Sequence, residues 1–432
     1  MVHDIIERGE EYLVILGRSP DLSYAELLSF LEARGEEYDL VQKEHDFSIL
    51  KISNKDFAQD VTRSVGSILK IAQKIICIPL IKEEMTSLEK ELSQLKLLDM
   101  SDDHFNWGVS GYGDSPYLRL IWQKVKNQIK KEIKMVKGKG NFIWPRKAHD
   151  KPFEKRFCIP LMPDDIIKKR LIDQGFEINI TLSNNLCCLW RTIGVLPLHD
   201  FNERDFKRPH QRPIYSISPA LARTMINLSK ARKSDIILDP FCGVGTILQE
   251  ALLSGFNVKG LDINSTCINQ TVDNLYWTSQ KYDLDYSKKN LEKDVQIGDA
   301  RSIEKIFPKR SIHAIVSEPD LGPPLRIFPS KDKANRILTQ TENLYTQFIT
   351  SAKKVLLNEG KMVLTFPIIR IQEGGFLRLL NLKKIVGHAG FFVSGGPYQI
   401  RPDGDDLHRS RKRIIEREIY VLNKRKPQGK LN

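Results

Sequence analysis

The sequence predicts an α/β protein whose carboxyl-terminal half forms a doubly wound, mostly parallel sheet. From residue 216 onward, short apolar strands alternate with segments of helical periodicity. The first three of these strands end on the acids Asp239, Asp262 and Asp299, and two glycines follow the first strand. Because open α/β sheets bind ligands outside the carboxyl ends of their strands, a site is expected at this edge.

Seven strands are expected in this half, with helices between the first five. The strands are predicted at residues 236–238, 258–263, 295–297, 314–316, 361–366, 390–394 and 414–422. The helices are predicted at residues 247–254, 265–279, 303–306, 344–357 and near 376–386. No long crossover helix separates the last two strands, so they are expected to form an antiparallel hairpin at the sheet edge.

The first 199 residues are expected to hold two α+β units. The order β-α-β-β-α-β is predicted at residues 12–16, 22–34, 38–42, 47–52, 57–74 and 75–81, as in a ferredoxin-like domain, here residues 1–95. A second domain, 96–199, contains a lysine-rich helix at residues 118–137 and a helix at 164–174. Residues 200–215, which are polar and rich in proline, are interpreted as a linker to the doubly wound domain, 216–432.

The composition is typical of a soluble globular protein, with 41% apolar and 28% charged residues among 432. No apolar run is long enough to span a membrane, and the acids near the N-terminus argue against a signal peptide, so a cytoplasmic location is expected. The six cysteines lack metal-site spacing, so we expect neither a zinc site nor a disulfide framework. The adjacent pair Cys187 and Cys188 is expected to lie in the core.

The net charge of +13 favours nucleic acid as a partner. The lysine-rich helix and the basic segment that follows the next strand are the predicted RNA-binding surface; the alternative is an ordinary solvated face. The predicted RNA-binding residues are Lys130, Lys131, Lys134, Arg146 and Lys147.

The strand-end acids predict a cofactor that contains an amine, a ribose and an adenine. Asp239, Gly243 and Gly245 are expected to hold the amine end, Asp262 the ribose hydroxyls and Asp299 the adenine amine. Leu248 stands where a dinucleotide fingerprint would have its third glycine, so phosphate-free S-adenosylmethionine fits better. The predicted cofactor-binding residues are Ser218, Asp239, Pro240, Phe241, Gly243, Gly245, Thr246, Asp262, Ile263, Asp299 and Ala300.

Two further residues of this loop have structural interpretations. Thr246 is expected to cap the helix that follows. Cys242 is expected to be packed within the loop rather than to act as a nucleophile.

The fourth strand ends in Glu318-Pro319-Asp320, the predicted catalytic residues. A carboxylate here can accept a hydrogen bond from an exocyclic amine and stabilise the charge that develops on its nitrogen during methylation. The Pro319 carbonyl would help Glu318, and Asp320 is a second candidate acceptor. The alternative is a turn that merely ends the strand.

The segment Asp239-Pro-Phe-Cys-Gly-Val-Gly-Thr resembles the cofactor loop of the THUMP-domain tRNA methyltransferases, which make N2-methylguanosine at tRNA position 10. Residues 204–209 and 216–223 resemble the segment that precedes this loop in the family, and residues 105–110, 118–137 and 141–145 resemble its THUMP domain. The resemblance implies a Rossmann-like seven-stranded methyltransferase domain, S-adenosylmethionine as cofactor and tRNA as substrate. Some members work with a small zinc-containing activator protein.

One segment departs from the family pattern. The family motif is Asp or Asn, then Pro, Pro and an aromatic, whereas this chain has Glu318-Pro319-Asp320-Leu321. The aromatic that would stack on guanine is missing, and Phe241 and Phe366 are candidate substitutes. Two alternatives therefore stay open: an RNA-binding protein that retains the cofactor but catalyses little, and a methyltransferase that acts on ribosomal RNA or another exocyclic amine.

Overall fold

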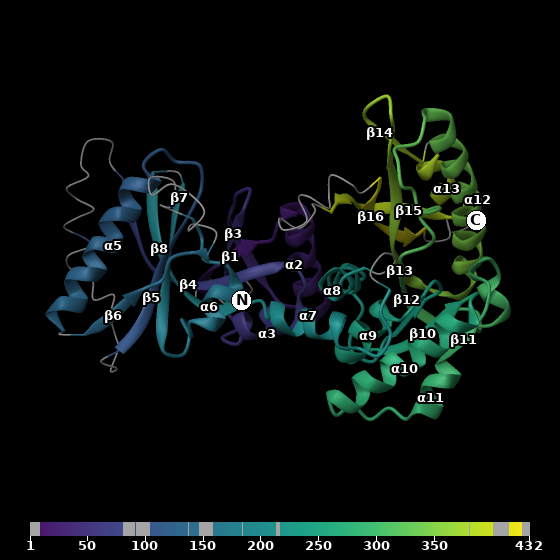
Figure 1. Ribbon diagram of the computed structural model, residues 1–432, viewed down its shortest axis with the longest axis horizontal. Coiled ribbons are helices and arrows are strands. Elements are labelled where there is room, and N and C mark those ends of the chain that lie inside the picture. The colour runs from purple at the N-terminus through teal and green to yellow at the C-terminus, as the bar shows by residue number, and fades with distance from the viewer. Residues whose placement is uncertain are drawn as a thin grey trace, which may run out of the picture. The chain divides into compact units, whose positions relative to one another are not determined.

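The computed structural model describes residues 9–80, 91, 104–136, 138–146, 159–183, 185–212, 217–379, 381–400 and 414–425 (Figure 1). The chain forms two compact units. Unit 1 comprises Met1–Pro20, Glu36–Ser64 and Ile68–His199, and unit 2 comprises Asp21–Gly35, Val65–Ser67 and Asp200–Asn432. Within the described ranges, no helix is both long and apolar enough to cross a membrane.

Unit 1 is built on an eight-stranded sheet with the order β2-β3-β1-β4-β8-β7-β5-β6. Its strands are β1 (Glu10–Leu16), β2 (Tyr38–Lys43), β3 (Phe47–Ile52), β4 (Ile68–Pro79), β5 (His104–Tyr112), β6 (Lys139–Phe142), β7 (Gly175–Ser183) and β8 (Leu186–Val195). Strands from both predicted amino-terminal domains share this sheet, since β4 pairs with β8. The division at residue 95 stays a prediction, and it falls in a segment outside the described residues.

The predicted β-α-β-β-α-β order is confirmed by β1, α2 (Pro20–Arg34), β2, β3, α3 (Phe57–Ser64) and β4. The predicted boundary between the last two elements is wrong, because α3 ends at Ser64 and β4 already begins at Ile68. The isoleucines of this segment recur at a spacing that also fits a helix. Their branched side chains favour a strand, and Gly66 separates the two elements.

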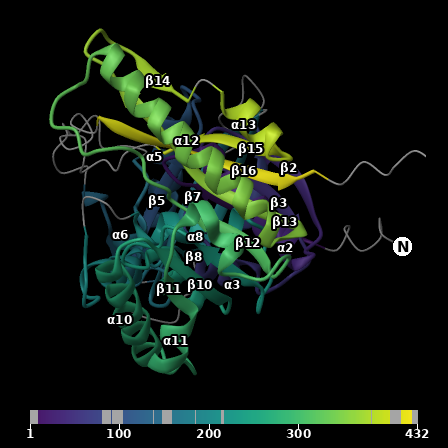
Figure 2. The ribbon, with the colours of Figure 1, turned by 90° about the vertical axis from the view of Figure 1, so that its right-hand side faces the viewer.

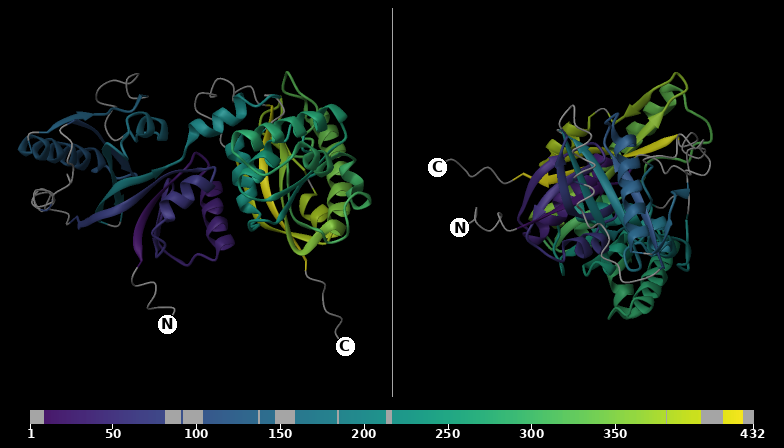
Figure 3. Two further views of the ribbon diagram at one scale, coloured as in Figure 1. Left: turned by 90° about the horizontal axis from the view of Figure 1, so that it is seen from below. Right: turned by 90° about the vertical axis from the view of Figure 1, so that its left-hand side faces the viewer.

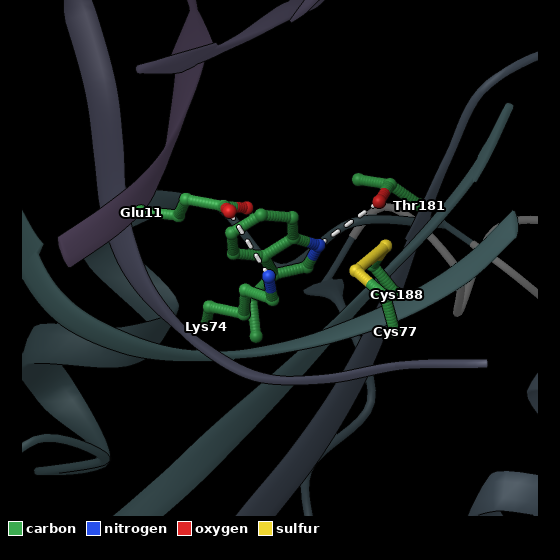
Figure 4. The surroundings of a disulfide bond; sticks show 6 residues. Glu11, Lys74, Cys77, Thr181 and Cys188 are labelled. Carbon is green, nitrogen blue, oxygen red and sulfur yellow. Dashed lines mark hydrogen bonds and ion pairs between the residues drawn. A yellow bond between two sulfur atoms is a disulfide. The ribbon is translucent and has the colours of Figure 1, made fainter. Parts of the chain in front are cut away.

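The expectation of no disulfide is also wrong. Cys77 of β4 and Cys188 of β8 lie directly opposite each other in the sheet and form a disulfide (Figure 4). They are 111 residues apart in the sequence, so spacing alone could not reveal the pair. Cys187 is a free, buried cysteine, as predicted.

The lysine-rich helix is α5 (Leu118–Met135), and its apolar face is buried as predicted. That buried face consists of Leu118, Ile121, Trp122, Val125, Ile129 and Ile133. A shorter helix, α6 (Pro163–Lys168), replaces the predicted helix at 164–174.

Unit 2 contains the predicted doubly wound sheet, in the order β11-β10-β9-β12-β13-β16-β15, with β14 paired to β13. Its strands are β9 (Ile236–Asp239), β10 (Asn257–Asp262), β11 (Val295–Ile297), β12 (Ile312–Ser317), β13 (Leu356–Arg370), β14 (Phe376–Arg378), β15 (Phe391–Gln399) and β16 (Ile415–Lys424). The first five are parallel, and β16 lies antiparallel between β13 and the edge strand β15. This confirms the predicted hairpin at the sheet edge.

Helices cover both faces of this sheet (Figure 3). One face packs against α8 (Pro219–Leu228), α9 (Thr246–Leu253) and α10 (Ser265–Lys281). The other packs against α12 (Lys331–Val355), seen in front of the sheet in Figure 2, and α13 (Leu382–His388). A short helix, α11 (Lys288–Asp294), precedes β11.

Three predicted helices of unit 2 differ from the structure. The helix predicted at 344–357 is the longer α12, and the one predicted near 376–386 is β14 followed by α13. The segment 303–306 belongs to a 3-10 helix, η3 (Ala300–Lys305). In β14, Phe376 pairs across the sheet with Arg370 of β13, a contact that local periodicity does not reveal.

Part of the predicted linker is also helical. Helix α7 (Leu198–Phe206) continues into residue 206 because Phe201 and Arg204 are buried on one side of it. Helix α7 is therefore anchored partly by a charged side chain, Arg204, which the polar composition of the segment would place in solvent.

Helix α2 belongs to unit 2, although its flanking strands belong to unit 1. Its Leu22 joins the same hydrophobic cluster as Ala222 and Met225 of α8. The buried Glu26 carboxylate accepts hydrogen bonds from the backbone N–H of Gly66, at 2.8 Å, and from Asn227 Nδ2, at 2.8 Å. These contacts make α2 part of the support for α8.

Candidate active site

The order of the unit 2 sheet reverses between β9 and β12, so the carboxyl ends of these neighbouring strands form a switch point. The glycine loop after β9 lies there. Gly243 and Gly245 both have positive φ, of 55° and 84°, which glycine adopts without a steric penalty. A Cβ on Gly245 would lie 2.8 Å from Thr271 Cγ2, whereas a Cβ on Gly243 would meet no atom within 4 Å. The loop is thus packed at Gly245 and open at Gly243.

The predicted cap of α9 is wrong. Gly245 is the N-cap, and Thr246 is the first residue of the helix. The Thr246 hydroxyl instead accepts a hydrogen bond of 2.7 Å from Arg208 Nη1. This contact ties the segment after α7 to the start of α9.

Asp239 ends β9 and is only 2% exposed. Its Oδ1 accepts hydrogen bonds from Ser317 Oγ, at 2.6 Å, and from the Phe241 N–H, at 3.1 Å. Burial, together with the charges of Asp262 and Glu318, raises the pKa of Asp239 to about 7. A cationic ligand group would therefore find a carboxylate that gains stability when it is paired.

Asp262 ends β10 and braces the glycine loop. Its Oδ2 accepts from the Gly243 N–H at 3.0 Å, and its Oδ1 accepts from the Asn264 N–H at 2.9 Å. Each carboxylate oxygen can accept more than one hydrogen bond, so Asp262 retains capacity for ligand hydroxyls. The neighbouring Ile263 is 72% exposed, an apolar surface that a flat ligand ring could cover.

Asp299 follows β11 and caps η3 through the Arg301 N–H, at 2.8 Å. The Arg301 guanidinium also donates to both carboxylate oxygens, which lowers the pKa of Asp299. Asp299 is thus ionised and engaged by a neighbouring cation. Its predicted contact with adenine stays a prediction.

A small pocket at the switch point brings several predicted residues together. Its lining consists of Ile217, Asp239, Phe241, Cys242, Gly243, Val244, Thr246, Ile247 and Glu318. Cys242 is buried, and burial raises the pKa of its thiol well above the usual value, so it is packed rather than nucleophilic, as expected.

Other predicted residues lie outside this pocket lining. Ser218 is the N-cap of α8, where its Oγ accepts from the Leu221 N–H at 3.3 Å. Pro240 and Ala300 are buried, and Ala300 joins the hydrophobic core. Asp262, Ile263 and Asp299 lie at the neighbouring strand ends, beyond the pocket lining.

Glu318 follows β12, and its side chain is 12% exposed. Both of its oxygens accept hydrogen bonds from Arg417 of β16, through Nε and through Nη2, the latter at 3.1 Å. No local pattern in the sequence reveals Arg417, because it lies 99 residues from Glu318 and reaches the site only through the antiparallel placement of β16.

Asp320 is exposed, and its Oδ1 accepts from the Gly322 N–H at 3.0 Å, as a turn residue does. The prediction that Phe366 could stack on guanine is wrong, because its ring is 2% exposed and Tyr345 and Tyr420 pack against it. Phe241 lines the pocket and packs edge-on against Phe348, so it stays a candidate.

The approach to the loop is held by a buried charge cluster. Glu250 of α9 accepts hydrogen bonds from Arg204 of α7, at 2.6 and 3.1 Å, and from Arg223 of α8, at 2.7 Å. All three side chains are buried. The cluster therefore joins three helices around the residues that precede the cofactor loop.

In unit 1, the predicted RNA-binding lysines Lys130, Lys131 and Lys134 are exposed on α5. Arg146 donates to Asp165 at 2.6 Å, so part of its charge is already neutralised. Lys147 lies outside the described residues. An RNA contact by any of them stays a prediction.

Known proteins share the fold and parts of the sequence of this chain. A family model described as an RMKL-like methyltransferase domain matches residues 207–373, and a DNA methylase model matches residues 19–273. A tRNA (guanine(10)-N2)-dimethyltransferase of Methanothermobacter thermautotrophicus is 27% identical over 94% of this chain and 98% of its own length. One from Pyrococcus abyssi is 31% identical over 47% of this chain and 57% of its own length. TrmN from Thermus thermophilus shares the fold, with a TM-score of 0.54 at 15% identity over 96% of this chain and 99% of its own.

Proposed function

We propose that this chain methylates N2 of a guanosine in tRNA, at position 10, because residues 207–373 match the RMKL-like methyltransferase domain and a tRNA (guanine(10)-N2)-dimethyltransferase is similar to nearly the whole chain. The observation that carries the proposal is the relative of that name, which matches 94% of this chain and 98% of its own length. The pocket at the switch point supports it, because Asp239 and Glu318 line the same small space.

The cofactor is S-adenosylmethionine, which supplies an electrophilic methyl group when bound. Three features of the chain fit it. Asp239 is a buried carboxylate suited to the ammonium of the methionine end, and Gly243 leaves its outer side open. Asp262 has capacity for the ribose hydroxyls, and Ile263 offers an exposed apolar surface beside it. Asp299 would accept from the adenine amine.

Glu318 would accept a hydrogen bond from the N2 amine, with the Pro319 carbonyl as its companion. This directs the nitrogen lone pair away from the acceptors and toward the methyl group, and it stabilises the positive charge that develops on nitrogen. Transfer would be direct, without a covalent enzyme intermediate. Asp320 is a second candidate acceptor, and Phe241 is the candidate ring for the guanine.

The test incubates the full chain with unmodified tRNA and S-adenosylmethionine, followed by nucleoside mass spectrometry. Wild type should form N2-methylated guanosine, and Glu318→Ala should slow its formation roughly 100-fold or more, the usual worth of a positioned acid–base group. Glu359→Ala, an exposed acid of unit 2 outside the pocket lining, is the matched control. An unchanged rate in Glu318→Ala would remove Glu318 from the mechanism.

The same assay separates the alternatives. Ribosomal RNA and duplex DNA serve as competing substrates, the latter because a DNA methylase model also matches the chain. Methylation of either one but not of tRNA would replace the proposed substrate. Cofactor binding without any methylated product would favour an RNA-binding protein of low activity.

Two further expectations accompany this proposal. We expect the protein in the cytoplasm, where tRNA is modified. The small zinc-containing activator protein stays a prediction, and activity of the purified chain alone would argue that it is not required.

A further inference from the structure

We infer that Arg417 positions Glu318 for methyl transfer. The inference rests on the proposed function, since it assigns a role to a residue that supports the candidate acceptor. Arg417 is 16% exposed and lies on β16, whereas Glu318 follows β12. Strand β13 lies between β12 and β16 in the sheet, and Arg417 is opposite Pro367 of β13. The arginine therefore reaches the acid across an intervening strand.

The contact is bidentate. Two nitrogens of the planar guanidinium, Nε and Nη2, donate to the two different oxygens of the Glu318 carboxylate. A fork of this kind fixes the plane of a carboxylate as well as its position. Lysine, which presents a single ammonium, cannot define that plane.

The need for such a fork follows from the side chain at position 318. Glutamate has one more rotatable bond than the aspartate or asparagine of the family motif, so its carboxylate can occupy more positions. Held by Arg417, it is restricted to one. A carboxylate oxygen can accept more than one hydrogen bond, so the contact with Arg417 does not by itself prevent Glu318 from accepting from the target amine.

The two acids that flank Arg417 on β16 are paired with other arginines, so they do not compete with Glu318 for Arg417. Glu416 is held by Arg370 of β13, at 2.8 Å, and Glu418 by Arg378 of β14, at 2.9 Å. Both acids point away from Arg417, because side chains alternate along a strand. Each of the two glutamates of this segment thus has a cation of its own.

Arg417 also offsets charge where acids converge. Glu318 and Asp262 both add to the raised pKa of Asp239, so the three carboxylates are close enough to repel. A guanidinium on Glu318 reduces that repulsion. Arg417 is thus a positioning residue that acts through Glu318.

The test measures kcat and the KM for S-adenosylmethionine with full-length chain and tRNA. Arg417→Gln should lower kcat roughly 10- to 100-fold, the cost of a misplaced reacting group, and should raise the KM for the cofactor by a smaller factor, because Asp239 then faces an unneutralised Glu318. Arg417→Lys should recover part of the loss, because it keeps the charge and one hydrogen bond. Arg378→Gln is the matched control: it breaks the neighbouring ion pair with Glu418 and should leave kcat unchanged.

A double-mutant cycle with Glu318→Gln completes the test. If Arg417 acts through Glu318, Arg417→Gln should have no further effect on kcat in the Glu318→Gln background. Equal losses in both backgrounds, or a wild-type kcat in Arg417→Gln, would overturn the inference while the proposed function stands. A wild-type chain that forms no methylated nucleoside overturns the proposed function, and the inference with it. Arg417→Lys supplies the same comparison if Arg417→Gln does not fold.

Discussion

At the scale of single residues, local sequence sets the position of Asp239, whereas residues distant in the sequence set its pKa. Its place at the end of β9 follows from the sequence, because an acid directly after a short apolar strand is a local pattern. Its electrostatic state follows from burial and from Asp262 and Glu318, which come from two other strand ends. The result is a carboxyl whose pKa of about 7 makes it sensitive to pH in the neutral range.

We predict that the affinity for S-adenosylmethionine rises with pH as Asp239 loses its proton near pH 7. The ionised carboxylate attracts the cofactor ammonium, whereas the protonated form does not. Calorimetric titration between about pH 6 and pH 8 should show this rise in affinity. Asp239→Asn should bind the cofactor weakly at every pH in the range. Asp294→Asn, which only breaks a pair with Lys259, is the control. A pH-independent affinity in wild type would show that Asp239 does not titrate in this range.

The raised pKa of Asp239 also makes the free energy of unfolding fall as pH rises. The pKa of Asp239 is raised in the folded state from its ordinary value of 3.8 to about 7, so between these two pH values the native protein retains a proton that the unfolded chain has lost. Stability from this group is therefore present below the unfolded value and is lost as pH rises through the folded one. A bound cation should offset that loss, which suits a site that is stabilised by its ligand.

At the scale of elements, the segment before the cofactor loop is an anchored helix. Polar composition and prolines at residues 200–215 predict a linker. Arg204 is nevertheless buried because Glu250 neutralises it, and Arg223 shares the same acid. Local composition cannot reveal this, since the acid lies 46 residues further along the chain.

We predict that Glu250→Gln is strongly destabilising. The change removes the buried carboxylate that Arg204 and Arg223 share, and breaking a buried pair in this way costs roughly 3–5 kcal/mol. Urea unfolding should show the loss as a lower midpoint. Glu203→Gln removes an acid from surface ion pairs with Lys207, at 2.9 Å, and Lys281, at 2.7 Å, and should lower the midpoint far less. Equal midpoints for Glu250→Gln and wild type would show that the cluster contributes little.

At the scale of the whole molecule, net charge indicates the kind of partner, and chain connectivity links the two compact units. The net charge of +13 favours an anionic partner, and exposed lysines of α5 are candidates for part of that contact. Helix α2 connects strands of unit 1 but packs in unit 2, so the two compact units are not two successive stretches of the sequence.

We predict that tRNA affinity falls steeply with salt and that the lysines of α5 contribute to the slope. Replacing Lys130, Lys131 and Lys134 together by glutamine should reduce the slope of log affinity against log salt by roughly 2 to 3, because each phosphate contact releases a counterion. Binding assays at several salt concentrations measure the slope, and a triple variant of Lys288, Lys289 and Lys293 in α11 is the control. An unchanged slope in the α5 variant would show that these three lysines do not contact tRNA phosphates.

The sequence by itself determined the alternation of strands and helices in unit 2, the glycine loop and the strand-end acids Asp239, Asp262 and Asp299. These depend on periodicity and turn chemistry within a few residues. Only the tertiary structure decided that Arg417 holds Glu318, that Cys77 bonds Cys188 and that Glu26 supports α8 through Thr224. The residues in these pairs are 99, 111 and 198 positions apart. The physical reason is that a strand or helix specifies its buried face locally, whereas its partner across the sheet or core depends on how the whole chain packs.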